Sequence, residues 1–137
     1  MDEEKLNRLP PDVKKQFIKY AIKLSEKKKQ IIINKDFLTF VKHVWPEFIE
    51  GAHHKKIAKK FNEIAEGKIK RLIINMPPRH TKSEFASFLL PAWMVGRKPD
   101  LKIIQTTHTT ELAIRFGRKA KTLIDSPEYQ QMFKTTL

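Results

Sequence analysis

The sequence contains no cysteine, and this absence excludes two kinds of structural support. Neither a disulfide framework nor a zinc site built from thiolates is available to the chain. The lack of disulfides is compatible with a reducing compartment. With 137 residues the chain suits one domain and is long enough to bury a sizeable hydrophobic core instead.

Long hydrophobic runs are also missing. No apolar stretch approaches the ~20 residues that a membrane-spanning helix needs. The start of the chain, MDEEKLNRLPPDV, is acidic and polar, without the apolar stretch of a signal peptide. Both features predict a soluble protein of the cytoplasm that has no membrane partner.

Acidic residues are scarce relative to basic ones. The 15 Asp and Glu residues face 28 Lys and Arg residues, which gives a formal net charge of +13. Such a surface attracts polyanions, and nucleic acid is the first candidate partner. The alternative at this stage is that lysine-rich helices are simply well solvated.

Helical periodicity dominates the first half of the chain. After a polar lead-in, residues 1–9, apolar residues recur at helical spacing from Asp12 to the lysine cluster that ends at Lys29. A second helix is predicted to follow Asn34 as its N-cap. This pattern divides the chain into a basic helical extension, residues 1–33, and a second part, residues 34–137.

The second part opens with helices and then changes texture. A helix is predicted over 53–65, with Gly67 as its C-terminal cap. Residues 71–75 and 101–106 are short β-rich runs that suit buried parallel strands. Each is followed by a helical pattern, one from about residue 82 and one that Thr109 or Thr110 could cap and that runs to about residue 124.

Two prolines refine the helical pattern. Pro91 lies inside the helix that starts near residue 82, and it predicts a kink or an early end. Ser126-Pro127 is typical of the start of one more short helix. The order of helices, strand, loop, helix, strand and helix predicts an α/β fold, a doubly wound parallel sheet with flanking helices.

The loop between the first predicted strand and its helix is the most informative stretch. A Walker A loop reads G-x-x-x-x-G-K-[S/T] between a strand and a helix, and here Lys82-Ser83 occupies the last two positions. Met76 and Thr81 replace the two glycines. Amides at the start of the helix would face phosphate oxygens, Lys82 would reach the β- and γ-phosphates, and Ser83 would coordinate Mg²⁺.

Thr81 is the costly replacement in this loop. A position with φ > 0 is unfavourable for a β-branched residue, and Thr81 would carry strain of ~1–3 kcal/mol there. Either the loop has this strain or it follows a different path. An ordinary basic turn before a helix is the competing interpretation of the whole stretch.

The segment MPPRHTKSE, residues 76–84, resembles the variant Walker A loop of the phage terminase large subunit family, which commonly reads PPRHGKS. Flanking segments resemble the same family, including FVKHVWPEFIEGAHHKKIAKKF upstream and ELAIRFGRKAKTLIDSPEY downstream. The resemblance covers roughly residues 36–135. It implies a P-loop ATPase of the ASCE type that moves double-stranded DNA into a procapsid.

The resemblance also implies roles for individual residues. Arg79 would be a cis-acting arginine finger and would share catalysis with Lys82, because a guanidinium stabilises charge developing on the γ-phosphoryl group. A salt bridge or a DNA-phosphate contact is the alternative for Arg79. The residues that would contact ATP are Pro78, Arg79, His80, Thr81, Lys82, Ser83, Glu84 and His53, with Ser83 also binding Mg²⁺.

Two of these residues carry less specific expectations. His53 matches a family histidine near the nucleotide base, but Ala52 stands where the family often has Trp. A surface or helix-capping role is the alternative for His53 and for His54. His80 is expected to be a solvated loop histidine.

Partners and missing parts follow from the same resemblance. The family acts as a homo-oligomeric ring with a portal protein and a terminase small subunit. The sequence has no apolar run ending in Asp-Glu, so a Walker B strand and the nuclease domain are expected to be absent and the sheet incomplete. The chain is therefore expected to be a fragment without ATPase or nuclease turnover of its own.

Two other functions stay open on the sequence alone. One is another P-loop DNA-dependent ATPase, such as a helicase, although no helicase motifs are legible. The other is a non-enzymatic basic DNA-binding protein, which predicts salt-sensitive DNA binding without nucleotide dependence.

Overall fold

The structure of the chain, a computed structural model, describes residues 10–133. The chain forms two compact units, and the boundary between them falls between Ile32 and Ile33. The polar lead-in predicted for residues 1–9 lies outside the described residues. Within residues 10–133, no helix combines the length and the apolar character that crossing a membrane requires.

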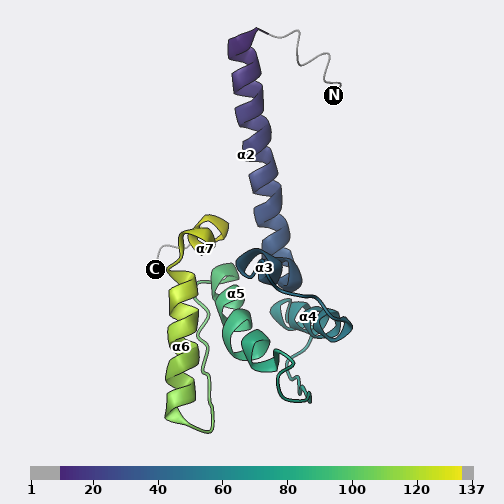
Figure 1. Cartoon of the computed structure of the whole chain (residues 1–137), viewed down its shortest axis with the longest axis vertical. Coiled ribbons are helices and arrows are strands. Elements are labelled where there is room, and N and C mark those ends of the chain that lie inside the picture. The colour runs from purple at the N-terminus through teal and green to yellow at the C-terminus, as the bar shows by residue number, and fades with distance from the viewer. Residues whose placement is uncertain (1–9, 134–137) are drawn as a thin grey trace. The chain divides into compact units, whose positions relative to one another are not determined.

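Every regular element among residues 10–133 is a helix, so the predicted α/β fold with a parallel sheet is wrong and the fold is all-α (Figure 1). The elements in chain order are α2 (Pro11–Lys35), α3 (Phe37–Val44), α4 (Ala52–Ala65), the π-helix η1 (Glu84–Leu89), α5 (Leu90–Arg97), α6 (Thr110–Ile124) and α7 (Pro127–Met132).

The two predicted strands are chain segments without regular structure. Burial alternates along residues 71–76, where Leu72 and Ile74 pack against the core and Ile73 is 86% exposed. Ile104 in the second segment is 91% exposed. A strand exists only as a member of a hydrogen-bonded ladder. Neither segment has such a partner among residues 10–133, so β propensity alone does not produce a sheet.

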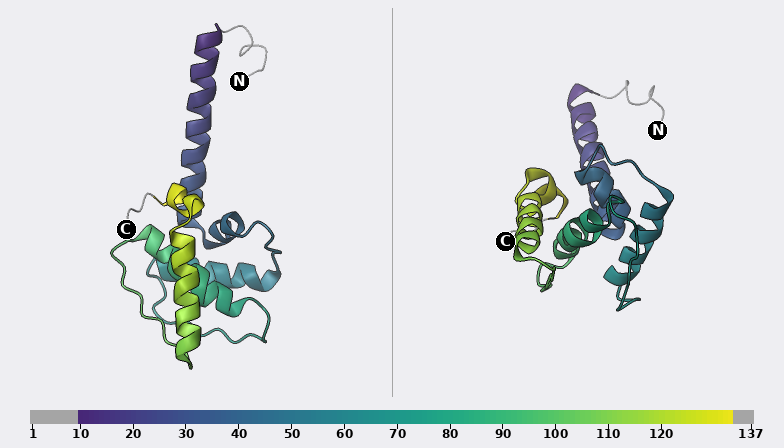
Figure 2. Two further views of the ribbon diagram at one scale, coloured as in Figure 1. Left: turned by 60° about the vertical axis from the view of Figure 1, so that its left-hand side comes forward. Right: turned by 60° about the horizontal axis from the view of Figure 1, so that its bottom comes forward.

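The core of the second unit is aromatic and is centred on Phe37, the first residue of α3. Its ring makes edge contacts with Phe61 of α4, Phe85 of η1 and Trp93 of α5, at centroid distances of 5.1, 5.4 and 5.5 Å. Such tilted pairs each add ~0.5–1.5 kcal/mol beyond the burial of their surface. This cluster of rings joins α3, α4, η1 and α5, which are distant in sequence. Helix α5 lies between α4 and α6 (Figures 1 and 2).

The boundary between α2 and α3 differs from the prediction. Asn34 was expected to cap the second helix, but α2 continues through it to Lys35. Asp36 is the N-cap instead, and its carboxylate accepts the Thr39 N–H at 2.8 Å. Asn62 of α4 donates to the other carboxylate oxygen at 2.8 Å, so this cap is also a tertiary contact.

Pro91 does not end the helix. The chain is helical from Lys82 to Arg97, and residues 84–89 form a π-helix, in which Leu90 N–H donates to Phe85 O. Pro91, which has no N–H, lies in the first turn of α5 directly after this π-helix. π-helical turns of this kind often occur at functional sites.

Helix α7 closes the core at the other end of the unit. The Tyr129 hydroxyl donates to Ala92 O at 2.6 Å, and burial raises the pKa of this phenol to about 12. Its hydroxyl and the Phe133 ring lie close to Gly96, where an added Cβ would be 2.6 Å from both groups. The close approach of α7 to α5 therefore depends on a glycine at this position.

Candidate phosphate-binding loop

Loop 76–84, the predicted Walker A region, has an unusual backbone. Arg79 has φ 65° and Thr81 has φ 57°, and these are the only non-glycine residues with positive φ among residues 10–133. Backbone segments with left-handed residues can turn successive N–H groups toward one side and so offer a concave site to an anion. The strain foreseen for Thr81 is therefore present in the structure.

The loop encloses its own cavity. A hollow of about 540 Å³ is lined by residues of this loop alone: Met76, Pro77, Pro78, Arg79, His80, Thr81, Lys82, Ser83 and Glu84. All of the loop residues expected to contact ATP thus face one space. These residues are therefore accessible from the cavity.

Lys82 and Ser83 form the first turn of the helical stretch that follows the loop. Phe85 N–H donates to Thr81 O at 2.9 Å, which starts the helix directly after the strained residue. Amides in a first helical turn have no carbonyl partner within the helix, and they carry the positive end of its dipole. An ammonium and a hydroxyl therefore stand beside several free donors at one helix start.

Arg79 is exposed and lines the same cavity. No carboxylate lies within ion-pair distance of its guanidinium among the described residues, so the alternative of a structural salt bridge is not seen. His80 is also exposed, and its Nδ1 lies 2.9 Å from Pro78 O, so this ring fixes the turn from within the loop.

His54, which the sequence left as a surface or capping residue, is the buried neighbour of the loop. It is 5% exposed, and its Nδ1 accepts the Gly51 N–H at 2.9 Å. Its Nε2 lies 2.6 Å from Thr81 Oγ1. Because Nδ1 is an acceptor, the proton of the neutral ring is on Nε2, which faces Thr81 Oγ1 and, at 2.9 Å, His53 Nε2.

The environment of His54 favours its neutral form. Burial lowers the pKa of this imidazole, and the neighbouring His53 lowers it further. Glu50 acts in the opposite direction and His80 adds to the decrease. A neutral ring is the form that the hydrogen bond from Gly51 requires.

His53 lies beside the loop but outside its cavity. Its ring packs against His54 at a centroid distance of 3.8 Å and against His80 at 5.8 Å. It lines a second hollow of about 280 Å³ between α4 and residues 72–76. The structure therefore places His53 near the loop and on a separate surface.

Glu84 lines the cavity and is also held by an ion pair from another helix. Both of its carboxylate oxygens accept from Lys119 of α6, at 2.8 and 2.9 Å. The first residue of η1 is thereby fixed to a helix that begins 26 positions later in the chain.

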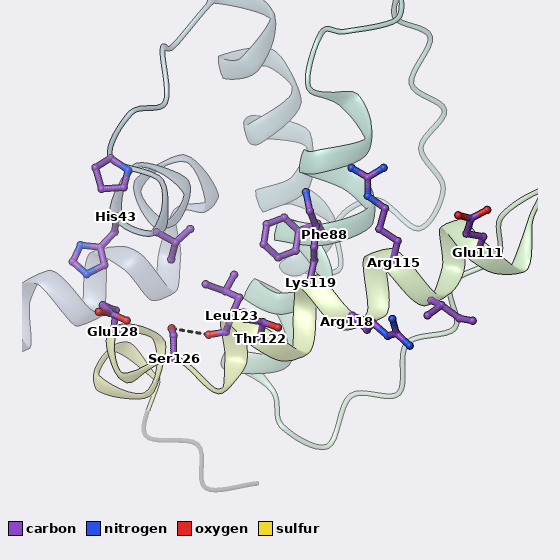
Figure 3. Close-up of a pocket in the computed structure, with 13 residues that line it drawn as sticks. His43, Phe88, Glu111, Arg115, Arg118, Lys119, Thr122, Leu123, Ser126 and Glu128 are labelled. Carbon is purple, nitrogen blue, oxygen red and sulfur yellow. Dashed lines mark hydrogen bonds between the residues drawn. The ribbon is translucent and has the colours of Figure 1, made fainter.

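A larger groove lies elsewhere in the second unit. This α6 groove has a volume of about 1240 Å³, and most of its lining comes from one helix (Figure 3). Its lining comprises His43, Val44, Pro46, Phe88, Glu111, Ile114, Arg115, Arg118, Lys119, Thr122, Leu123, Ser126 and Glu128. The groove is mostly apolar, with a cationic rim. Its chemistry does not match a triphosphate, and loop 76–84 takes no part in it.

Sequence reasoning did not connect His54 or Lys119 to the loop, although the helix-capping role considered for His54 is confirmed. His54 had a detectable local signal, because Gly51 stands three positions earlier as the N-cap of α4 and an N3 side chain can bond the cap N–H. Lys119 had none, since its partner lies 35 positions away.

Comparisons with known proteins supply no assignment: no family model, curated protein or solved structure matches the chain. Within residues 10–133, no three His, Cys, Asp or Glu side chains gather in a metal-binding arrangement. The assignment of the loop consequently depends on its own geometry and on the sequence resemblance.

Proposed function

We propose that loop 76–84 binds the phosphate chain of ATP, and that the chain is the nucleotide-binding part of a DNA-packaging motor of the terminase large subunit kind. The observation that carries the proposal is the cavity of about 540 Å³ at a helix start, enclosed by a loop with two left-handed residues. Such a loop can present amides to an anion without help from a sheet.

The side chains of the loop fit a triphosphate. Lys82 would pair with the β- and γ-phosphates as a point charge, and Arg79 would approach the γ-phosphate from the exposed side of the cavity. The Ser83 hydroxyl would hold Mg²⁺ together with phosphate oxygens, and the ion would neutralise their charge. His53 would lie on the flank of the loop, and Pro78, His80 and Thr81 would shape its turn.

The proposed motor would act on double-stranded DNA and assemble with other proteins. A net charge of +13 supports contact with double-stranded DNA, the substrate that the motor would move. A portal protein, a terminase small subunit and further copies of the chain in a ring are the partners of such a motor. Its place of action would be the cytoplasm of an infected host cell.

The test is an isothermal calorimetric titration of the 137-residue chain with Mg·ATP. We expect weak but saturable binding, a loss of affinity of at least about ten-fold for Lys82→Ala, and negligible ATP turnover. Lys121→Ala is the matched control, because it removes the same charge from an exposed site on α6 outside the α6 groove. Affinity equal in all three proteins would contradict the proposal.

Two further outcomes separate the alternatives. ATP hydrolysis that survives Lys82→Ala would overturn the assignment of the site. Binding of double-stranded DNA that falls with salt, combined with no nucleotide binding at all, would identify a non-enzymatic basic DNA-binding protein instead.

A further inference from the structure

Thr81 needs an external support for its backbone. Its φ of 57° is uncommon for any residue with a side chain, and a β-branched side chain makes it costlier. Strained residues of this kind persist only where the surrounding structure over-determines them. A contact from outside the loop must therefore hold Thr81 in this conformation.

A chain of hydrogen bonds runs from Gly51 through the His54 ring to the Thr81 hydroxyl. Gly51 N–H donates to His54 Nδ1, and the Nε2–H of the same ring points at Thr81 Oγ1, 2.6 Å away. The Thr81 hydroxyl in turn donates to His80 O at 2.7 Å, so it has only its lone pairs to offer to His54. The same His54 Nε2 atom also lies 2.9 Å from His53 Nε2, so its single proton is shared between Thr81 Oγ1, the nearer acceptor, and His53.

The His54 ring is held by aromatic packing. The His54 ring lies against Phe48 and Phe85, with centroids 4.8 and 5.1 Å away. Phe85 is completely buried in the aromatic core. His54 therefore contacts the aromatic core, the N-terminus of α4 and the loop residue Thr81 at the same time.

We propose that His54 is a positioning residue, which holds Thr81 in the left-handed conformation and so keeps loop 76–84 open for phosphate. This inference rests on the proposed function for its consequence, since the phosphate site is the one that His54 would organise. A glycine adopts positive φ without strain. In this chain the hydrogen bond from His54 would take the place of that conformational freedom.

The test compares the affinity for Mg·ATP of two substitutions at His54. His54→Phe keeps the packing against Phe48 and Phe85 but removes the donor, and we expect about a ten-fold loss of affinity. His54→Gln keeps an N–H donor for Thr81, and we expect affinity within about two-fold of the original. Circular dichroism checks that both variants keep their helices.

A second pair of variants tests the mechanism itself. Thr81→Gly removes the need for support, so His54→Phe should cost nothing when it is introduced into the Thr81→Gly protein. An equal loss of affinity in the two backgrounds would overturn the positioning role, because it would show that His54 acts independently of Thr81.

Hydrogen exchange of the backbone amides of residues 79–83, measured without nucleotide, separates this inference from the proposed function. His54→Phe should accelerate exchange several-fold in the Thr81 background and not in the Thr81→Gly background. If this pattern appears in a chain that binds no nucleotide, the proposed function fails and the positioning role stands. If nucleotide binds and His54→Phe changes neither exchange nor affinity, the positioning role fails alone.

Discussion

Lys119 of α6 binds both carboxylate oxygens of Glu84, at 2.8 and 2.9 Å, and its ammonium also lies 5.4 Å from the centre of the Phe88 ring. Glu84 directly follows Ser83, so this contact joins α6 to the exit of loop 76–84. One long side chain thus connects the rim of the α6 groove with the candidate phosphate site.

The Glu84–Lys119 pair is expected to contribute little stability but measurable coupling. Both side chains are about one-third exposed, so Lys119→Ala should lower the free energy of unfolding by only ~0.5–1 kcal/mol. The double variant Glu84→Lys with Lys119→Glu exchanges the two charges. In urea denaturation its loss of unfolding free energy should be smaller than the sum of the losses in the two single variants. Strict additivity would show that the two charges do not interact.

Gly96→Ala should destabilise the second unit. The added methyl group would lie 2.6 Å from the Phe133 ring and from the Tyr129 hydroxyl, and overpacking of this kind costs ~1–3 kcal/mol. Thermal unfolding measures the effect. Gly117→Ala is the matched control: it lies within α6 with nothing within 4 Å of its Cβ, and it should stabilise by ~0.5–1 kcal/mol.

Stability should fall as the solution becomes mildly acidic, through His54. Burial and the neighbouring His53 lower its pKa in the folded chain, while the unfolded chain titrates near 6.5. The unfolded state then binds more protons, so stability is complete above pH 6.5 and is lost progressively as the pH falls toward the folded pKa. Glu50 and His80, which also act on this ring, do not reverse the shift.

The measurement for this prediction is the unfolding free energy from pH 7.5 to 5, in the original chain and in His54→Gln. The difference between the two curves should grow in favour of the variant as the pH decreases, because glutamine has no charge to acquire. A constant difference over this range would show that His54 keeps its normal pKa.

Asp36→Ala should be more damaging than the loss of an ordinary helix cap. Caps of this kind contribute ~0.5–2 kcal/mol, and here the substitution also leaves Asn62 without its acceptor. Asn62 in turn accepts the N–H of Phe37, the central residue of the core. Urea denaturation should place the loss at or above ~2 kcal/mol.

Asp12→Ala is the control for this substitution, because Asp12 lies in the first turn of α2 and is exposed. Its effect should stay within ~0.5 kcal/mol. Burial opposes ionisation of Asp36, but hydrogen bonds from Thr39 and Asn62 outweigh it and lower its pKa. Its contribution should therefore be present above pH 3.8 and disappear as the pH falls through the folded pKa.

Signals that act within about four residues were predictable from sequence. Thr109 caps α6 and Ser126 caps α7, each accepting an N–H three positions on, and Gly67 ends the chain's third predicted helix with φ 77°. These features need no distant partner, because a cap and the amide it binds are neighbours along the chain. The strain at Thr81 was predictable for the same reason, since it follows from residue type and motif position.

Features that need a distant partner were not predictable. The apolar runs at 71–75 and 101–106 have the composition of strands, but a strand also needs a ladder partner, and none pairs with them within residues 10–133. Asn34 does not cap the second helix: α2 runs through it to Lys35, and Asp36, whose carboxylate also accepts from Asn62 of α4, is the cap.

Residue order along the chain was enough to place the helices with local caps, the strongly basic charge, and a loop with an ammonium and a hydroxyl at a helix start. Packing between distant segments was needed to show that the β-rich runs remain unpaired within residues 10–133 and that His54 and Lys119 reach the loop from α4 and α6. The physical reason is the range of the interactions: periodicity and capping act along the chain, whereas ladder pairing, burial and the direction of a buried imidazole N–H depend on segments that folding brings together.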